Sequence, residues 1–191
     1  MAKRTFQDDG TLESDLYDGC CQQERRAQSA VYSRFAPYAL GVMRRFGVAA
    51  EDDRELLQDI FVEVFRNIAR YDARKGPFTT WLRNITVQRT IDHQRRGRKL
   101  SFIALDSVQE PVVEETDLRE VAPEYLRRLI ADLPSGYRAV FTLYAVYDYD
   151  HASIAQLLGI SQSSSRSQYT RARRALQQSL THQQKPNRHA R

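Results

Sequence analysis

Residues His151 to Tyr169 read HASIAQLLGISQSSSRSQY, and this segment is the most informative part of the sequence. Asp150 precedes it and can cap a helix, because a short carboxylate accepts from the free N–H groups of a first turn. Gly159 can end that helix, since glycine accepts the left-handed backbone of a tight turn. Ser161 can cap a second helix, and Ala155 supplies the small side chain that two closely crossing helices need. The pattern predicts a helix-turn-helix.

The second helix of this pair carries side chains suited to the major groove of DNA. Arginine can bind guanine through two parallel hydrogen bonds, glutamine can bind adenine in the same way, and serine can donate to phosphate. The candidate DNA-binding residues are Gln162, Ser163, Ser164, Arg166, Ser167, Gln168, Arg171, Arg173 and Arg174. An ordinary helical hairpin would also use Ala and Gly at the crossing, but it would not need a second helix without acids. Ser165 departs from the pattern, because many such helices place a buried Val or Ile there.

Composition limits what the rest of the chain can be. The 191 residues are 41% hydrophobic and 28% charged, and they include only 8 Gly and 6 Pro, which argues against a turn-rich all-β fold. No apolar run approaches the roughly 20 residues of a membrane span, and the first ten residues lack the apolar core of a secretory signal. We therefore expect a cytoplasmic protein. Cys20 and Cys21 are adjacent and are the only cysteines, so neither a disulfide nor a zinc cage is predicted.

Charge is segregated along the chain more strongly than the net value of +5 suggests. Residues 51–63 carry six acids against one Arg, and residues 83–99 carry six bases against one Asp. Residues 106–124 carry seven acids against one Arg, and residues 166–191 carry seven bases and no acid. Blocks of one sign indicate separate contact surfaces, whereas a single solvated face would mix its signs. Charged helix faces followed by a basic tail are the alternative.

Hydrophobic spacing predicts helices and no strands. Apolar residues recur every three or four positions over 30–46, in spite of Pro37, and again over 53–68 and 78–94. Residues before about 27 are polar and show no period, so we expect a loose extension there. The sequence predicts an all-α fold of two small helical domains joined by an acidic linker, the second domain containing the helix-turn-helix. The expected boundaries are an N-terminal extension 1–29, a first domain 30–97, a linker 98–122, a second domain 123–182 and a basic tail 183–191.

Two segments of the chain resemble a known family. They are ELLQDIFVEVFRNIARYDARKGPFTTWLRNITVQRTIDHQRR, from Glu55, and LPSGYRAVFTLYAVYDYDHASIAQLLGISQSSSRSQYTRARRAL, from Leu133. Together they resemble the extracytoplasmic-function (ECF) sigma factors, the smallest members of the sigma-70 family of bacterial transcription initiation factors. The resemblance covers residues 30–180, and both motifs occur in the family's order. It implies a factor that is not an enzyme and holds no cofactor or metal, and that recognises promoter −10 and −35 elements and promotes DNA melting.

The resemblance also implies where the first domain meets RNA polymerase. In the family, an acidic helix of this domain binds a coiled coil of the largest subunit of core polymerase. The matching residues are Glu55, Leu56, Gln58, Asp59, Phe61 and Val62. An acidic and partly apolar helix does not favour DNA, so a protein partner makes physical sense. A merely solvated acidic face would need no exposed apolar groups.

Recognition of the −10 element is implied for the loop and helix that follow. Family members capture an extruded base with the loop that here reads Arg74-Lys75-Gly76-Pro77-Phe78, which we call the capture loop. A flipped base needs a pocket and a stacking surface, and a single strand needs cationic guidance. The implied −10 contacts are Arg74, Lys75, Phe78, Arg83, Asn84, Gln88, Arg89, Arg95 and Arg96. We expect Trp81 to belong to the core, and we expect Asp92 to orient an arginine. The helix from Ser161 would bind the −35 element, and the linker would thread through the polymerase.

Two other classes of protein compete with this interpretation. A DNA-binding regulator acting without polymerase would use the second domain alone and would leave the first for dimerisation. An enzyme is disfavoured because His93, His151, His182 and His189 are scattered without metal-ligand spacing, and no phosphate-binding glycine loop is present. We expect a free protein that is monomeric. Anti-sigma factors are common partners in this family, and the acidic helix is a natural target for one.

Overall fold

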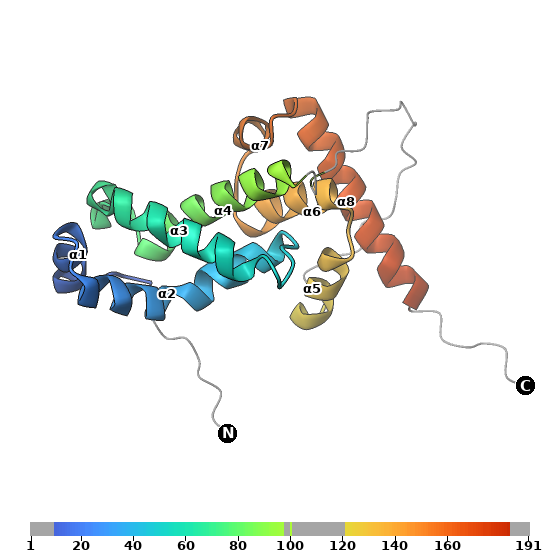
Figure 1. Cartoon of the computed structure of the whole chain (residues 1–191). Coiled ribbons are helices and arrows are strands. Elements are labelled where there is room, and N and C mark those ends of the chain that lie inside the picture. Colours follow the sequence, from blue (N-terminus) through green and yellow to red (C-terminus); the bar gives the residue numbers. More distant parts are fainter. Residues whose placement is uncertain (1–9, 98–99, 101–120, 184–191) are drawn as a thin grey trace, which may run out of the picture. The chain divides into compact units, whose positions relative to one another are not determined.

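The computed structural model describes residues 10–97, 100 and 121–183, and its regular elements are helices (Figure 1). Contacts divide the chain into two compact units, which are described separately. Unit 1 comprises Met1–Arg44 and Val48–His93, and unit 2 comprises Arg45–Gly47 and Gln94–Arg191. Nearly all of the expected acidic linker 98–122 and of the basic tail 183–191 lies outside the described residues. Among the described helices, none is long and apolar enough to cross a membrane.

The first helices of unit 1 begin earlier than the sequence pattern predicts. Helix α1 (Ser14–Cys21) lies within the segment expected to be a loose extension, and α2 (Arg25–Arg45) runs through Pro37. The expectation of a structureless extension is therefore wrong for residues from 14 onward. Leu12 and Cys20 belong to the apolar core of the unit, and burial raises the pKa of the Cys20 thiol to about 11. Packing against distant residues, rather than local periodicity, explains this helix.

The remaining helices of unit 1 agree with the pattern of apolar residues. Helix α3 (Asp53–Asn67) leads through two short 3₁₀ turns, η1 (Ile68–Arg70) and η2 (Ala73–Lys75), to α4 (Phe78–Arg96), whose last three residues belong to unit 2. The predicted stripe on α3 is confirmed, because Leu56, Leu57, Ile60, Phe61 and Val64 are buried. Asp52 stands at the N-cap of α3, but its side chain makes no capping hydrogen bond. Asp52 instead places its Oδ2 atom 3.3 Å from Nε2 of His93 on α4.

Unit 2 contains α5 (Pro123–Ala131), α6 (Ser135–Phe141), a π-helical turn η4 (Thr142–Val146), α7 (His151–Leu158) and α8 (Gln162–Gln183). Pro123 occupies the first turn of α5, where the N–H group that proline lacks would have no partner within the helix. The apolar run over 137–147 does not form one α-helix, because its second half widens into η4. A core of Leu129, Leu133, Phe141, Ala172, Leu176 and Leu180 joins α5 and α6 to α8.

Candidate nucleic-acid interface

The helix-turn-helix of unit 2 forms as the sequence predicts. The Asp150 carboxylate accepts from the backbone N–H groups of Ala152 at 2.8 Å and Ser153 at 2.9 Å, which caps α7. Gly159 ends α7 with φ 65° and ψ 37°, the left-handed conformation that glycine adopts without strain. Ser161 then caps α8 by accepting from the N–H of Ser164 at 3.0 Å. These three local signals fix the turn between the two helices.

Helix α8 separates exposed polar side chains from buried ones. Gln162, Ser163, Arg166 and Thr170 are exposed, and their spacing places them on one side of the helix. We call these four residues the recognition face. Ser165, Ala172 and Leu176 lie on a different side of the helix and are almost completely buried. No residue from 162 to 183 is acidic, so the recognition face belongs to a helix with only positive side-chain charge.

Several of the predicted DNA-binding residues of α8 are partly or fully buried. Gln168 is only 2% exposed, so the expectation that it contacts DNA is corrected: its side chain packs inside unit 2. Ser164 and Ser167 are half-buried, as are Arg171, Arg173 and Arg174. A half-buried arginine can still present its guanidinium, because the long stem packs while the charged end stays in water.

Ser165 shows why a polar residue is tolerated where a buried aliphatic one was expected. Its hydroxyl lies 2.9 Å from Nδ1 of His151 at the start of α7, so the buried oxygen has a partner. The His151 ring stacks on Tyr144 with the ring centroids 4.5 Å apart. Burial, followed by the charge of Arg166, lowers the pKa of His151. A hydrogen bond between the two helices therefore replaces the usual apolar contact.

In unit 1, the capture loop is held by interactions that the sequence analysis did not identify. The Tyr71 hydroxyl donates to the carbonyl of Gly76 at 3.2 Å, which closes the loop. Asp72 accepts from Nε and Nη2 of Arg74 at 2.9 and 3.0 Å and from the backbone N–H of the same residue at 3.1 Å. The Arg74 hydrogen bonds lower the pKa of Asp72 to about 2. The arginine is thus oriented by its neighbour, while Lys75 extends from an exposed position.

A cluster of buried aromatic residues encloses the last residue of the capture loop, Phe78. Phe78 has no exposed area and packs against Phe35 and Tyr71, with centroid separations of 4.7 and 5.3 Å. The expectation that Phe78 contacts DNA is corrected, because its ring is enclosed by this cluster. Trp81 is half-buried and packs 5.6 Å from Phe78, which agrees with its expected place in the core.

Helix α4 presents its polar side chains unevenly. Asn84, Gln88, Arg95 and Arg96 are exposed, whereas Arg83, Arg89 and Asp92 are half-buried. Arg89 is fixed by Glu63 of α3, whose Oε2 atom lies 2.5 Å from Nη2. Glu63 also accepts from the side chain of Asn67 at 2.8 Å. The Arg89 side chain is therefore oriented before any nucleic acid binds.

Helix α3 has an acidic face that includes an exposed apolar side chain. Glu55, Gln58, Asp59 and Val62 are exposed and follow one another at helical spacing, and we call them the docking face. Val62 is 40% exposed. Leu56 and Phe61 are 1% and 2% exposed, so the expectation that they contact polymerase is corrected to a role in the core. An acidic face that only contacts water would not need an exposed apolar side chain such as Val62.

The comparisons with known proteins agree with this architecture. A family model described as sigma-70 region 2 matches residues 31–100, and one described as sigma-70 region 4 matches residues 124–176. The ECF RNA polymerase sigma factor RpoE of Cereibacter sphaeroides is 26% identical over 72% of this chain and 77% of its own length. The RNA polymerase sigma-H factor of Pseudomonas aeruginosa is 24% identical over 89% of this chain and 95% of its own.

Solved structures resemble the chain more distantly. CnrH, in complex with the cytosolic domain of CnrY, is 20% identical, with a TM-score of 0.46 over 87% of this chain and 96% of its own. RpoE of Bartonella quintana, in complex with the anti-sigma factor NepR, is 17% identical, with a TM-score of 0.48 over 80% of this chain and 96% of its own.

The two matched regions together cover more than half of the residues. Region 2 precedes region 4 along the chain, as unit 1 largely precedes unit 2. The chain belongs to the sigma-70 family of transcription initiation factors. Its curated relatives include ECF sigma factors of several bacteria, such as SigM of Bacillus subtilis, which is 28% identical over 64% of this chain and 76% of its own length. The protein is an ECF RNA polymerase sigma factor for transcription initiation, and it is not an enzyme.

Proposed function

We propose that this sigma factor divides promoter recognition and polymerase binding among three surfaces. The recognition face of α8 reads the −35 element as duplex DNA. The capture loop and the exposed side of α4 bind the −10 element as a single strand. The docking face of α3 binds the coiled coil of the largest polymerase subunit. The observation that carries this division is the difference between the exposed side chains of two helices. Helix α8 exposes no acidic side chain, whereas α3 exposes acidic side chains together with Val62.

The −35 assignment rests on Arg166 and its neighbours on the recognition face. Arg166 is exposed one helical turn after Gln162, near the N-terminal end of α8, which is the end of a recognition helix that meets base edges. An arginine in this place can pair with guanine through two hydrogen bonds. Arg173 and Arg174 follow further along the helix, and their half-buried side chains would meet phosphate with their charged ends.

The −10 assignment rests on cations that the fold has already oriented. Asp72 holds Arg74, Glu63 holds Arg89, and Lys75 lies exposed in the capture loop. A single strand needs guidance along its backbone and a surface on which its bases can stack. Side chains that are held in advance lose less conformational entropy when the strand binds.

The docking face suits a protein partner with basic and apolar groups. Its two carboxylates would steer association, and Val62 would be removed from water on binding. An anti-sigma factor that covered the same four residues would exclude polymerase. We therefore propose that any such inhibitor acts by competition at this face.

The test is reconstituted transcription with core polymerase on a promoter chosen from genomic fragments. Three templates are compared: the intact promoter, one with a scrambled −35 element and one with a scrambled −10 element. Strand opening is monitored by the fluorescence of a base analogue in the region that melts. We expect opening only on the intact template and only with polymerase present. Tight, sequence-specific binding by the factor alone would instead support a regulator that acts without polymerase.

A further inference from the structure

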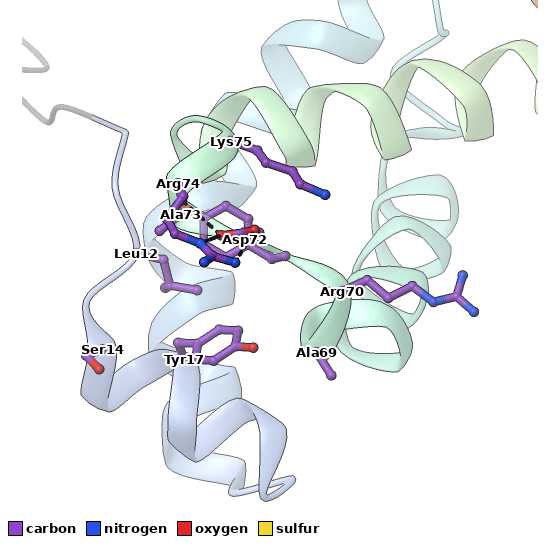
Figure 2. Close-up of a pocket in the computed structure, with 10 residues that line it drawn as sticks. Leu12, Ser14, Tyr17, Ala69, Arg70, Asp72, Ala73, Arg74 and Lys75 are labelled. Carbon is purple, nitrogen blue, oxygen red and sulfur yellow. Dashed lines mark hydrogen bonds and ion pairs between the residues drawn. The ribbon is translucent and has the colours of Figure 1, made fainter.

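A hollow in unit 1 lies beside the capture loop and has one wall that comes from the N-terminal segment. Its volume is about 580 Å³, and it lies between residues 69–75 on one side and Leu12, Ser14 and Tyr17 on the other (Figure 2). All three residues of the second wall precede residue 31, where the match to sigma-70 region 2 begins. We call residues 10–21 the N-terminal strap.

The N-terminal strap is fixed to the start of α4 and to α2. The carbonyl of Gly10 accepts from the backbone N–H of Thr79, near the start of α4, at 3.1 Å. Gly10 has φ +72°, and a Cβ atom there would lie 2.3 Å from Oγ1 of Thr79, so the close approach requires glycine. Glu13 pairs with Arg34 of α2 at 3.2 Å. A hydrogen bond and an ion pair therefore hold this wall of the hollow against the rest of unit 1.

The two walls have the chemistry of a site for a nucleotide. Tyr17 is half-buried and meets Tyr71 edge to face, with the ring centroids 6.3 Å apart, so its ring is held but not covered. Arg70, Arg74 and Lys75 are exposed on the opposite wall, where Asp72, which is paired with Arg74, offsets one of the three positive charges. Pockets of about 300–1,000 Å³ hold small organic ligands. The hollow has room for one nucleotide and is too small for a duplex.

We infer that the N-terminal strap is part of the single-strand binding site, and that Tyr17 is the residue against which one unstacked base packs. Leu12 forms the apolar side of the same wall, and the cations of the capture loop take the adjoining phosphates. This inference rests on the proposed −10 function of the loop. It adds a specificity-determining residue from a helix that precedes the matched family region.

The experiment measures binding of holoenzyme, formed from core polymerase and the full chain, to a fluorescent single-stranded oligonucleotide carrying the −10 element. We expect Tyr17→Ala to weaken binding by about 5- to 150-fold, the range that stacking of one base spans. Tyr17→Phe keeps the ring and should stay within about twofold of the unaltered protein. Asp15→Ala, on an exposed position of the same helix that does not line the hollow, is the matched control.

A second measurement separates stacking from a loss of folding. Each base of the oligonucleotide is removed in turn, which leaves an abasic sugar. With the unaltered protein, one position should lose binding strongly; with Tyr17→Ala, removing that same base should have little further effect. If the two losses simply multiply, Tyr17 does not contact the base, and the inference is wrong. A competitor mixture of the four deoxynucleoside monophosphates that displaced the strand at low concentration would assign the hollow to free nucleotides and overturn the inference.

The outcomes also distinguish this inference from the proposed −10 function. If the unaltered holoenzyme does not bind the strand, the −10 assignment fails and the inference fails with it. If the strand binds and Lys75→Ala weakens it, but Tyr17→Ala behaves like Asp15→Ala, the −10 assignment stands and only the role of the N-terminal strap is rejected.

Discussion

Replacing Arg166 by alanine tests the recognition face most directly. The side chain is exposed on α8, so its removal should change the free energy of unfolding by no more than about 0.5 kcal/mol. A bidentate contact with a base edge contributes about 1–3 kcal/mol, so promoter binding should weaken by about 5- to 150-fold. The loss should be confined to one base pair of the −35 element, where the variant should no longer distinguish the original base from the other three.

The assay is gel-shift binding and run-off transcription by holoenzyme on a panel of promoters that covers each −35 substitution. Arg166→Lys keeps the charge but lacks the planar, rigid pair of N–H donors, so it should recover general affinity better than it recovers discrimination. Gln178→Ala, exposed on the same helix and distant from the recognition face, is the control.

The alternative role of Arg166 is a phosphate contact, and salt distinguishes the two. Each phosphate contact contributes about −0.9 to the slope of log K against log salt concentration. If Arg166→Ala weakens every sequence equally and the slope becomes less steep by about one, Arg166 contacts the backbone, and our assignment of base recognition to it is refuted.

Three further perturbations test other parts of the chain. Asp59→Arg should lower affinity for core polymerase while leaving the thermal stability of the chain unchanged, because the side chain is exposed; undiminished capture of the polymerase in a pull-down would count against the docking face. Gly159→Ala should destabilise unit 2 by about 1–2 kcal/mol in urea unfolding, because an alanine at φ 65° is strained, and Gly159→Asn should cost less. The folded structure lowers the pKa of His151 below its ordinary value of 6.5, mainly by burial and then by Arg166, while Asp150 opposes the shift. The unfolded chain therefore binds the proton more readily, so the contribution of His151 to stability is complete above pH 6.5 and is lost as the pH falls below it. Unfolding at pH 7.5 and 5.5 should show this loss, and His151→Gln should reduce it; an equal pH response in both proteins would contradict the assignment.

The helix-turn-helix could be predicted because its signals are local. The Asp150 cap, the left-handed Gly159 and the Ser161 cap each act within three or four residues of chain, and all three appear in the structure. Charge segregation is also a property of the sequence itself. The order of the two units along the chain follows from the same local patterns.

Helix α1 could not be predicted from local pattern because its stabilisation is not local. Leu12 and Cys20 become core residues only when α2 and the start of α4 come near them. Neither residue belongs to a recognisable apolar period, so the segment appears polar and structureless in the sequence. The contact of Gly10 with Thr79, 69 residues later, likewise exists only in the folded unit.

The residue pattern alone predicts which residue types lie at helical spacing, where helices begin and end, and which stretches carry one sign of charge. Which member of each set stays exposed depends on the folded units. Phe61 and Val62 are neighbouring apolar residues of α3, yet Phe61 is covered by Tyr32, with the ring centroids 4.8 Å apart, and Val62 is not. Gln162 and Gln168 are chemically identical, but one is exposed and the other is packed inside unit 2. The physical reason is that burial depends on what other helices bring against a side chain, and those neighbours are distant in the sequence.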